Sequence, residues 1–272
     1  MKTNIVVDKS YLQGVSTARI RELSSTSRLL VSDALFYELL TTELEARKRC
    51  FSKFPPENNP VDLVSHIGPL MRIEIDSRMR AGKPSDHREN LNFNFKFNSA
   101  LVDDGYVFPP EATAVIDEHT AELRNDVGSY IERVSLVPTF FPNLLKGTTE
   151  ERKAAVTAAE EAIAAPNALL RFYSNLEPPP GESSLPSAEM IDETWALYRW
   201  LQVQFLFSVD VFARYQGAHP DITNPKIYEK MEHDVLDAQV LMLACLEGAF
   251  ATREKKLKRW WSLLCPKAPL YE

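Results

Sequence analysis

The feature that most constrains the fold is a short β-branched run at the start of the chain, residues 4–7, which ends in the acidic residue Asp8. Such a run is typical of a buried strand, and a helical pattern of apolar residues begins directly after it. Strand-to-helix units build parallel sheets, and the side chain at the carboxyl end of a strand projects toward the crevice where such sheets bind ligands. The sequence therefore predicts an α/β fold with Asp8 at its ligand-binding edge.

A second strand-to-helix unit follows. Residues 28–32 form another short apolar run, and a helix is expected over residues 33–54 with Glu38 in its second turn. Residues 11–24 have helical spacing and predict a crossover helix between the two strands. Because crossover connections between parallel strands keep one hand, the tips of both strands lie at one edge, where Asp8 and Glu38 can converge.

More acids stand near the other end of the chain. Residues 249–252 predict a third strand whose last residue is the N-cap of a helix, with Glu254 in the first turn. On the preceding helix, Asp234 and Asp237 are three residues apart and share one face. Because residues 235–246 are almost entirely apolar, an ionised Asp237 needs an arginine, a proton, or a metal ion shared with other acids.

Composition narrows the class of protein. The chain has 272 residues, of which 44% are hydrophobic, enough for a sizeable core. Three cysteines without a Cys-x-x-Cys pair suit a reducing compartment, and no stretch has the length and apolarity of a signal peptide or a membrane span, so a cytoplasmic protein without membrane contact is expected. The net charge of −7 argues against nonspecific binding to nucleic acid. An all-oxygen ligand set favours Mg²⁺ or Mn²⁺ over zinc.

The organisation along the chain predicts two parts. We expect an α/β core made of residues 1–54 and 191–272, interrupted by a mainly helical insert over residues 55–190 with a proline-rich loop near residues 177–186. An apolar helix over residues 191–215 is assigned to the core. Within the insert the expected elements are a helix over 61–80, a short strand over 90–98, helices over 111–134 and 148–165, and a strand or buried loop over 135–141.

Basic residues gather in two places. The first lies on one side of the expected helix over residues 61–80 and continues just beyond it, and it is either a solvated helix face or a surface that contacts phosphates. The second lies in the last helix, where Trp260 and Trp261 have the spacing of a buried helix face rather than of a base-stacking surface. The candidates for contact with a nucleic-acid backbone are Arg72, Arg78, Arg80, Arg253, Lys255 and Lys256.

Four pieces of the chain, in order, resemble the PIN-domain nucleases. They are Ile5-Val6-Val7-Asp8 with Ser10-Tyr11-Leu12, the stretch from Leu30 to Leu39, Asp237-Ala238 entering an apolar helix, and the stretch from Gly248 to Leu257. The resemblance covers residues 1–54 and 225–266 and implies a Rossmann-like parallel sheet flanked by helices. It places Asp8, Glu38, Asp237 and Glu254 on the catalytic, metal-binding positions, with Asp234 as an additional metal ligand.

This resemblance implies an endoribonuclease that hydrolyses phosphodiester bonds with a water activated on Mg²⁺ or Mn²⁺. Two departures from the family stand out: Glu254 replaces the usual aspartate, and the helical insert is large. Two alternatives stay open, a catalytically inactive PIN-like scaffold that binds a protein and a structure-selective DNA nuclease. A regulatory protein partner and a homo-oligomer also remain open.

Overall fold

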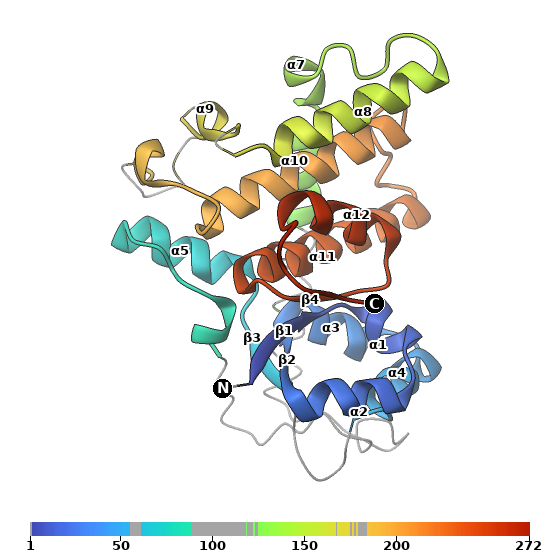
Figure 1. The fold of residues 1–272 in the computed structure, drawn as a ribbon. Helices are drawn as coiled ribbons and strands as arrows, with labels where there is room; N and C mark the ends of the chain where they lie inside the picture. Colours follow the sequence, from blue (N-terminus) through green and yellow to red (C-terminus); the bar gives the residue numbers. More distant parts are fainter. Residues whose placement is uncertain are drawn as a thin grey trace. The chain divides into compact units, whose positions relative to one another are not determined.

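Figure 1 shows the fold, which was obtained as a computed structural model. The structure describes residues 2–54, 61–88, 125–166, 168–174 and 184–272, together with residues 118, 122, 176 and 178. The chain divides into two compact units. Unit 1 consists of Met1–Leu70, Gly82–Thr120 and Gln239–Glu272, and unit 2 consists of Met71–Ala81 and Ala121–Ala238.

Unit 1 is built on a five-stranded sheet with all of its strands parallel. The strand order is β3-β2-β1-β4-β5, so β1 is central and the order reverses between β1 and β4. Helices flank this sheet, which confirms the predicted α/β class with a parallel sheet (Figure 1). The strands are β1 (Thr3–Val7), β2 (Ser27–Ser32), β3 (Val61–Val64), β4 (Phe250–Ala251) and β5 (Leu270–Tyr271).

The two helices expected after β1 and β2 are each split into a pair. The first pair is α1 (Lys9–Gly14) and α2 (Thr17–Thr26), and the second is α3 (Asp33–Thr41) and α4 (Leu44–Phe51). Ser16 begins α2 by accepting a hydrogen bond from the backbone N–H of Arg19, and Thr42 adopts an extended backbone that ends α3. An N-cap serine and a β-branched residue both favour a helix end over a helix interior, so the expected continuous helices were wrong.

The segment 61–80, expected as one helix, begins with a strand. Its first four residues form β3, which pairs with β2 in the register Leu29↔Val61 to Ser32↔Val64, and only then does α5 (Ile67–Ser77) begin. The prediction was wrong because a four-residue apolar run has no period that separates strand from helix, and the pairing partner lies far away in sequence.

The division into compact units differs from the predicted boundaries. Residues 61–70 belong to unit 1 and not to an insert, and residues 191–238 belong to unit 2 and not to the sheet-bearing part. The reason is packing: α10 (Ala196–Arg214) contacts α8 (Thr149–Ala164) and α7 (Val137–Phe140), all three within unit 2. The helix α11 (Pro225–Glu247) begins in unit 2 and ends in unit 1.

The remaining expected elements have mixed outcomes. The predicted helix over 148–165 is α8, and residues 137–140 form α7 instead of a strand or buried loop. Residues 118, 122 and 125–134 are helical, as expected, whereas the strand over 90–98, the other residues of the helix over 111–134 and most of the loop 177–186 lie outside the described residues. The other elements of the two units are η1 (Pro84–Asp86), α9 (Leu170–Tyr173), η3 (Ala188–Met190) and α12 (Lys255–Leu264).

The last helix, α12, buries one face as its spacing predicts. Leu257, Trp260, Trp261 and Leu264 are buried, and Lys256 lies over the ring of Trp260 with its Nζ 5.5 Å from the ring centroid. The tryptophans are therefore core residues, not exposed stacking surfaces. In the part of the chain that the structure describes, none of the helices combines the length and the apolarity needed to cross a membrane.

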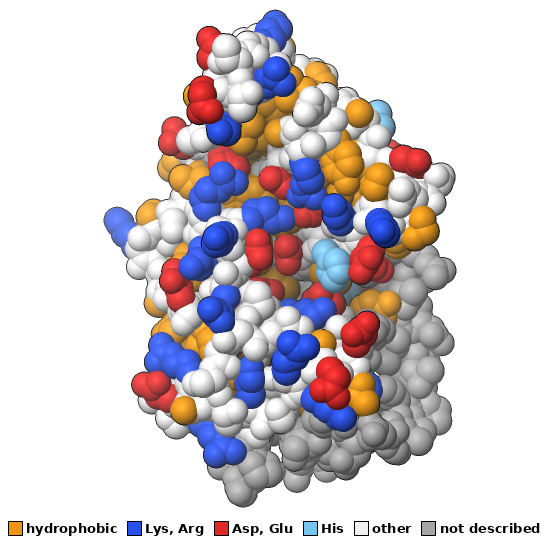
Figure 2. Space-filling view, turned by 90° about the vertical axis from the view of Figure 1, so that its right-hand side faces the viewer, with side chains coloured by type: hydrophobic (Ala, Val, Ile, Leu, Met, Phe, Trp, Pro, Cys, Tyr) orange, Lys and Arg blue, Asp and Glu red, His pale blue; other side chains and the backbone are white. Residues whose placement is uncertain are grey.

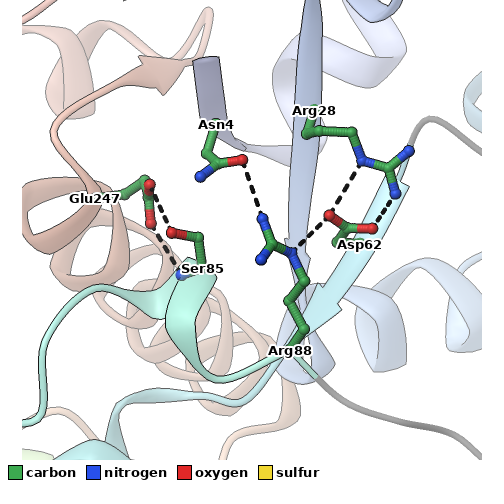
Figure 3. A network of polar contacts seen from close by, with 6 residues as sticks. All are labelled: Asn4, Arg28, Asp62, Ser85, Arg88 and Glu247. Carbon is green, nitrogen blue, oxygen red and sulfur yellow. Dashed lines mark hydrogen bonds and ion pairs between the residues drawn. The ribbon is translucent and has the colours of Figure 1, made fainter. Parts of the chain in front are cut away.

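A polar network fixes residues 82–88 to the sheet of unit 1 (Figure 3). The carboxylate of Asp62 on β3 accepts hydrogen bonds from Nε and Nη2 of Arg28 on β2. It also accepts one from Nε of Arg88 at 2.8 Å. Ser85 donates both its N–H and its hydroxyl to the carboxylate of Glu247, each at 3.0 Å. Burial raises the pKa of Asp62, but the two guanidinium groups outweigh it and hold the pKa below its ordinary value of 3.8.

We expect Asp62→Asn to lower the free energy of unfolding by about 1 kcal/mol at neutral pH, because the ion pairs are partly exposed and screened. Since the folded-state pKa of Asp62 is depressed, this stabilisation is complete above pH 3.8 and is lost as the pH falls through the folded-state pKa. Urea unfolding of both proteins between pH 3 and pH 7 checks this, and a stability difference that does not shrink in acid would contradict it.

In unit 2 a distant carboxylate caps the start of α10. Trp195, the N-cap residue, makes no side-chain cap, and instead Glu74 accepts hydrogen bonds from the N–H groups of Ala196 at 2.8 Å and Leu197 at 2.9 Å. Glu74 is fully buried and also accepts from Ala81 N–H at 3.2 Å. The charge at the helix N-terminus suits the helix dipole, so Glu74 joins residues 71–81 to α10.

We expect Glu74→Ala to destabilise the chain by about 3 kcal/mol, because it leaves buried N–H groups without an acceptor. The matched control is Glu161→Ala, which removes an exposed glutamate from α8 and should change the stability by less than about 0.5 kcal/mol. Thermal and urea unfolding provide the measurement. Equal effects of the two substitutions would rule out the capping role.

Candidate functional site

The polar centre of unit 1 is the carboxylate of Asp8 at the carboxyl end of β1. Its Oδ2 accepts hydrogen bonds from the N–H of Ser10 at 3.3 Å, from the hydroxyl of Ser10, and from the hydroxyl of Thr252 at 2.8 Å. Thr252 directly follows β4, which pairs with β1. The site therefore lies where the strand order reverses, the place at which open α/β sheets bind their ligands.

The two carboxylate oxygens of Asp8 have different surroundings. All three hydrogen bonds go to Oδ2, and Oδ1 accepts none from the residues that the structure describes. Asp8 is only 4% exposed. Burial raises its pKa above the ordinary 3.8, the hydrogen bonds of Ser10 and Thr252 lower it, and the negative charge of Glu38 raises it. The hydrogen bonds therefore orient the carboxylate through one oxygen and leave the other without a donor among the described residues.

Glu38 on α3 lies close enough to Asp8 for the two charges to interact, as the strand-tip prediction required. Its Oε1 forms an ion pair with Lys9 Nζ at 2.9 Å, and Lys9 is the residue that follows Asp8 in the chain. Both side chains of this pair are less than one fifth exposed. The structure thus brings two predicted carboxylates together and adds a lysine that the sequence reasoning missed.

A second acid–base pair lies at the same edge of the sheet. Asp33 follows β2, His66 follows β3, and Asp33 Oδ2 lies 2.9 Å from His66 Nδ1. The sequence reasoning missed both residues because it assigned 61–80 to a helix. The only local signal is the two β-branched valines of residues 61–64, and so short a run does not by itself distinguish a strand from a helix.

Thr252 and Glu254 differ from their predicted roles. Thr252 is not the N-cap of α12; Glu254 occupies that position and its side chain makes no capping hydrogen bond. Thr252 instead accepts a hydrogen bond from the N–H of Glu254 at 3.1 Å while its own hydroxyl binds Asp8. The Glu254 side chain is exposed. It lies two residues after Thr252 in the chain, but it is not buried as Thr252 and Asp8 are.

The two acids of α11 that were predicted as metal ligands, Asp234 and Asp237, have separate surroundings in unit 2. Asp234 is buried and accepts hydrogen bonds from both terminal nitrogens of Arg214, at 2.7 Å and 3.2 Å. Its charge is therefore balanced by an ion pair rather than by a metal ion. Asp237 is half-buried, whereas a fully buried carboxylate was expected. The expectation was wrong because a nearly apolar sequence does not reveal that one side of α11 stays accessible at this position.

The predicted nucleic-acid contacts do not form one patch within a single unit. Arg72, Arg78 and Arg80 belong to unit 2, where Arg78 donates to the backbone oxygen of Ser184 at 2.9 Å. Arg80 donates to Thr194 at 3.3 Å, and Arg72 lies 4.0 Å from Asp76. Figure 2 shows lysine and arginine side chains distributed among acidic ones over the face that it draws.

The basic candidates of unit 1 are also mostly engaged. Arg253 donates a hydrogen bond to the carbonyl of Gly14 at the end of α1, where a cation suits the helix dipole. Lys256 lies over the Trp260 ring, and Lys255 is exposed.

Among the described residues, no group of three His, Cys, Asp or Glu side chains has a geometry that could hold a metal ion. Magnesium, however, is commonly bound by one or two carboxylates with water and substrate phosphates completing the octahedron. Asp8, with a donor-free Oδ1, and the neighbouring Glu38 supply such a pair of oxygen ligands. The two carboxylates therefore fit as ligands of a magnesium or manganese ion bound in this way. Such an ion would compete with Lys9 for the carboxylate of Glu38.

Comparisons of the chain with models of known protein families, with curated proteins and with solved structures find no match.

We expect Thr252→Val to raise the pKa of Asp8 further, because the substitution removes a hydrogen bond to the ionised form while keeping the side-chain volume. The matched control is Thr26→Val, an exposed threonine of α2 in the same unit, which should leave the pKa unchanged. Carbon-detected NMR titration of the Asp8 carboxyl measures both. An unchanged Asp8 pKa in Thr252→Val would show that this contact does not stabilise the carboxylate.

Proposed function

We propose that unit 1 is a divalent-metal-dependent nuclease whose centre is Asp8. The observation that carries the proposal is the asymmetric carboxylate: three donors orient Oδ2, and Oδ1 has no donor among the described residues. A buried carboxylate with a raised pKa is unstable in its charged form unless a cation compensates it. A divalent ion shared with Glu38 would provide that compensation.

In this proposal each residue has a defined task. Asp8 Oδ1 and a Glu38 oxygen hold the ion, while Ser10 and Thr252 fix the direction in which Asp8 points. When bound, Mg²⁺ or Mn²⁺ supplies a Lewis acid that lowers the pKa of a water and stabilises negative charge on a phosphate. Lys9, released from Glu38, carries a positive charge beside the phosphate. Glu254 remains a sequence-based candidate for a further ligand, and so does Asp237, which belongs to unit 2.

RNA is the proposed substrate class, and the PIN-like identity of unit 1 is part of the same proposal. Both derive from the resemblance of the residues around Asp8, Glu38 and Glu254 to PIN-domain nucleases. The all-parallel sheet, with Asp8 at its order reversal, supports them because that fold places strand-tip acids at one edge. Lys255 and Arg253, which flank Glu254, are the cations of unit 1 proposed to contact the RNA backbone.

The test compares metal binding by the native chain, Asp8→Asn and a matched control, Asp221→Asn. Asp221 accepts the N–H and hydroxyl of Thr223, the same local motif that Ser10 makes with Asp8, but it lies exposed in unit 2. We expect calorimetry to show that the native chain binds Mn²⁺ saturably, with a dissociation constant below about 1 mM. Asp8→Asn should weaken this binding at least tenfold, and Asp221→Asn should leave it unchanged.

Cleavage assays then test the substrate class. Labelled single-stranded RNA, single-stranded DNA and a flap duplex are incubated with the native chain and Mg²⁺ or Mn²⁺. We expect cleavage of RNA that Asp8→Asn reduces at least 100-fold and chelation abolishes, because the ion supplies the main charge stabilisation. Preferred cleavage of the flap duplex would replace RNA with DNA as the substrate class.

A non-catalytic scaffold is the second candidate, and the Lys9–Glu38 ion pair favours it. A lysine that neutralises one of two neighbouring carboxylates removes part of the need for a metal ion. The same calorimetric experiment separates the two functions. Absence of saturable Mn²⁺ binding at millimolar concentration, or binding that survives Asp8→Asn, would reject the nuclease in favour of the scaffold.

A further inference from the structure

The histidine–aspartate pair of unit 1 has no task in the nuclease proposed above. Asp33 follows β2, His66 lies two residues after the end of β3, and Asp33 Oδ2 is 2.9 Å from His66 Nδ1. Both side chains are less than one quarter exposed. The pair lies at the same edge of the sheet as Asp8, so it is close to the centre at which the reaction is proposed to occur.

The strand order determines how close the pair is to Asp8. Asp8, Asp33 and His66 follow the adjacent strands β1, β2 and β3, and the register of these strands shows that their ends are level to within two residues. Neighbouring strands are about 4.8 Å apart, so the backbone of His66 is roughly 10–12 Å from that of Asp8. A phosphodiester group held at Asp8 can therefore lie within reach of the imidazole.

Asp33 determines how the imidazole is oriented and protonated. Because an ionised carboxylate only accepts hydrogen bonds, the contact at 2.9 Å requires a proton on His66 Nδ1, and the negative charge favours the imidazolium form. Asp33 is itself held by the backbone, since its Oδ1 accepts a hydrogen bond from the N–H of Ala34 at 2.6 Å. The second ring nitrogen, Nε2, then carries the proton that can be transferred.

The surroundings of Nε2 leave space for a bound molecule. Gly68 lies beside it in the first turn of α5, and a Cβ on this glycine would be 2.8 Å from Nε2, about the length of a hydrogen bond. Apart from the chain neighbours of Gly68 and the backbone of α5, only the His66 ring comes within 4 Å of that position among the described residues. Glycine therefore leaves room next to Nε2 for an oxygen atom of a substrate.

We propose that His66 is the general acid of the nuclease and that Asp33 is its positioning residue, an inference that rests on the proposed function of unit 1. Water attacks the phosphorus, and the bond from phosphorus to the ribose 3′-oxygen breaks as the new bond forms. The electron pair of the broken bond stays on the 3′-oxygen, which takes the proton from His66 Nε2. The attacking water loses a proton to solvent, and the imidazole then regains one from solvent.

A structural role for the same pair predicts a different behaviour. A positioned acid accelerates the departure of an alkoxide by about 100- to 10,000-fold, because it supplies the proton that the leaving oxygen needs. A pair that only joins the ends of β2 and β3 would affect every substrate alike. The two roles therefore differ for a substrate whose leaving atom needs no proton.

Two labelled RNA oligonucleotides test the role of His66, one natural and one with sulfur in place of the 3′-bridging oxygen at one linkage. A thiolate leaves without being protonated. Single-turnover rates are measured with Mn²⁺ for the native chain, Asp8→Asn and His66→Asn, which keeps an N–H near the position of Nδ1 and removes Nε2. We expect His66→Asn to slow cleavage of the natural linkage at least 100-fold and of the sulfur linkage less than threefold. Asp8→Asn should slow both at least 100-fold.

Further variants test the positioning residue and the control. Asp33→Asn should slow cleavage of the natural linkage at least tenfold and of the sulfur linkage less than threefold, because it acts only through His66. His219→Gln changes an exposed histidine of unit 2 and should cleave both linkages at the native rate. If His66→Asn fails to fold, His66→Gln replaces it, since a side-chain amide does not donate a proton to a leaving group.

Nitrogen-15 NMR of the metal-free chain provides a measurement that does not depend on activity. We expect both ring nitrogens of His66 to carry protons at pH 7 in the native chain, and one of them to lose its proton in Asp33→Asn, because the negative charge that favours the imidazolium is removed. A native chain in which Nε2 is unprotonated at this pH would overturn the general-acid role.

The outcomes separate this inference from the proposed function. If the native chain cleaves neither linkage, or if cleavage survives Asp8→Asn, both the nuclease and its general acid are rejected. If cleavage depends on Asp8 while His66→Asn slows both linkages equally, or slows neither, the general acid alone is rejected.

Discussion

The hydrogen bond from Thr252 to Asp8 is the contact on which the candidate site depends. It joins residues from opposite ends of the chain, one after β1 and one after β4, across the point where the strand order of the sheet reverses. The β1–β4 ladder itself is short, since it pairs only Val6 with Phe250 and Val7 with Ala251. The backbone hydrogen bond from Asp8 N–H to the carbonyl of Ala251, at 2.9 Å, continues the ladder into the site. The sheet and the site are thus held together by the same residues.

Two of the acids at this edge have a basic side chain as partner. Lys9 forms an ion pair with Glu38, and His66 Nδ1 lies against Asp33, whereas Asp8 is stabilised by hydroxyl and backbone donors without an ion pair among the described residues. A buried carboxylate without a cation is costly, so of these three acids Asp8 is the one at which a cation or a proton would bring the largest gain. This contrast with Asp234, whose charge Arg214 balances, distinguishes the candidate ligand from the structural acid.

The two units differ in the side chains that they gather. Unit 1 carries acids at the edge of a parallel sheet, and unit 2 carries a pocket lined by aromatic side chains and Arg133. The first segment of unit 2, residues 71–81, is joined to the start of α10 in the second segment by the hydrogen bonds of Glu74. The helix α11 begins in unit 2 and ends in unit 1.

The sequence by itself determined the elements with a strong local signal. The β-branched run of β1, the apolar run of β2, the serine that begins α3, the capping box of α8, and the glycine that ends α11 all act within a few residues, so they can be read from the sequence. The same holds for the buried face of α12 and for the convergence of Asp8 with Glu38. Each of these follows from the period or the direction of a single element.

Only the tertiary structure decided the contacts between distant segments. Residues 61–64 form a strand because they pair with β2, and Asp234 forms an ion pair with Arg214. Thr252 donates a hydrogen bond to Asp8 and does not cap a helix. Residues 191–238 belong to unit 2. The physical reason is that a short apolar run or an isolated charge has several acceptable environments of similar free energy. The choice among them depends on which distant surface packs against it, and no local pattern encodes that surface.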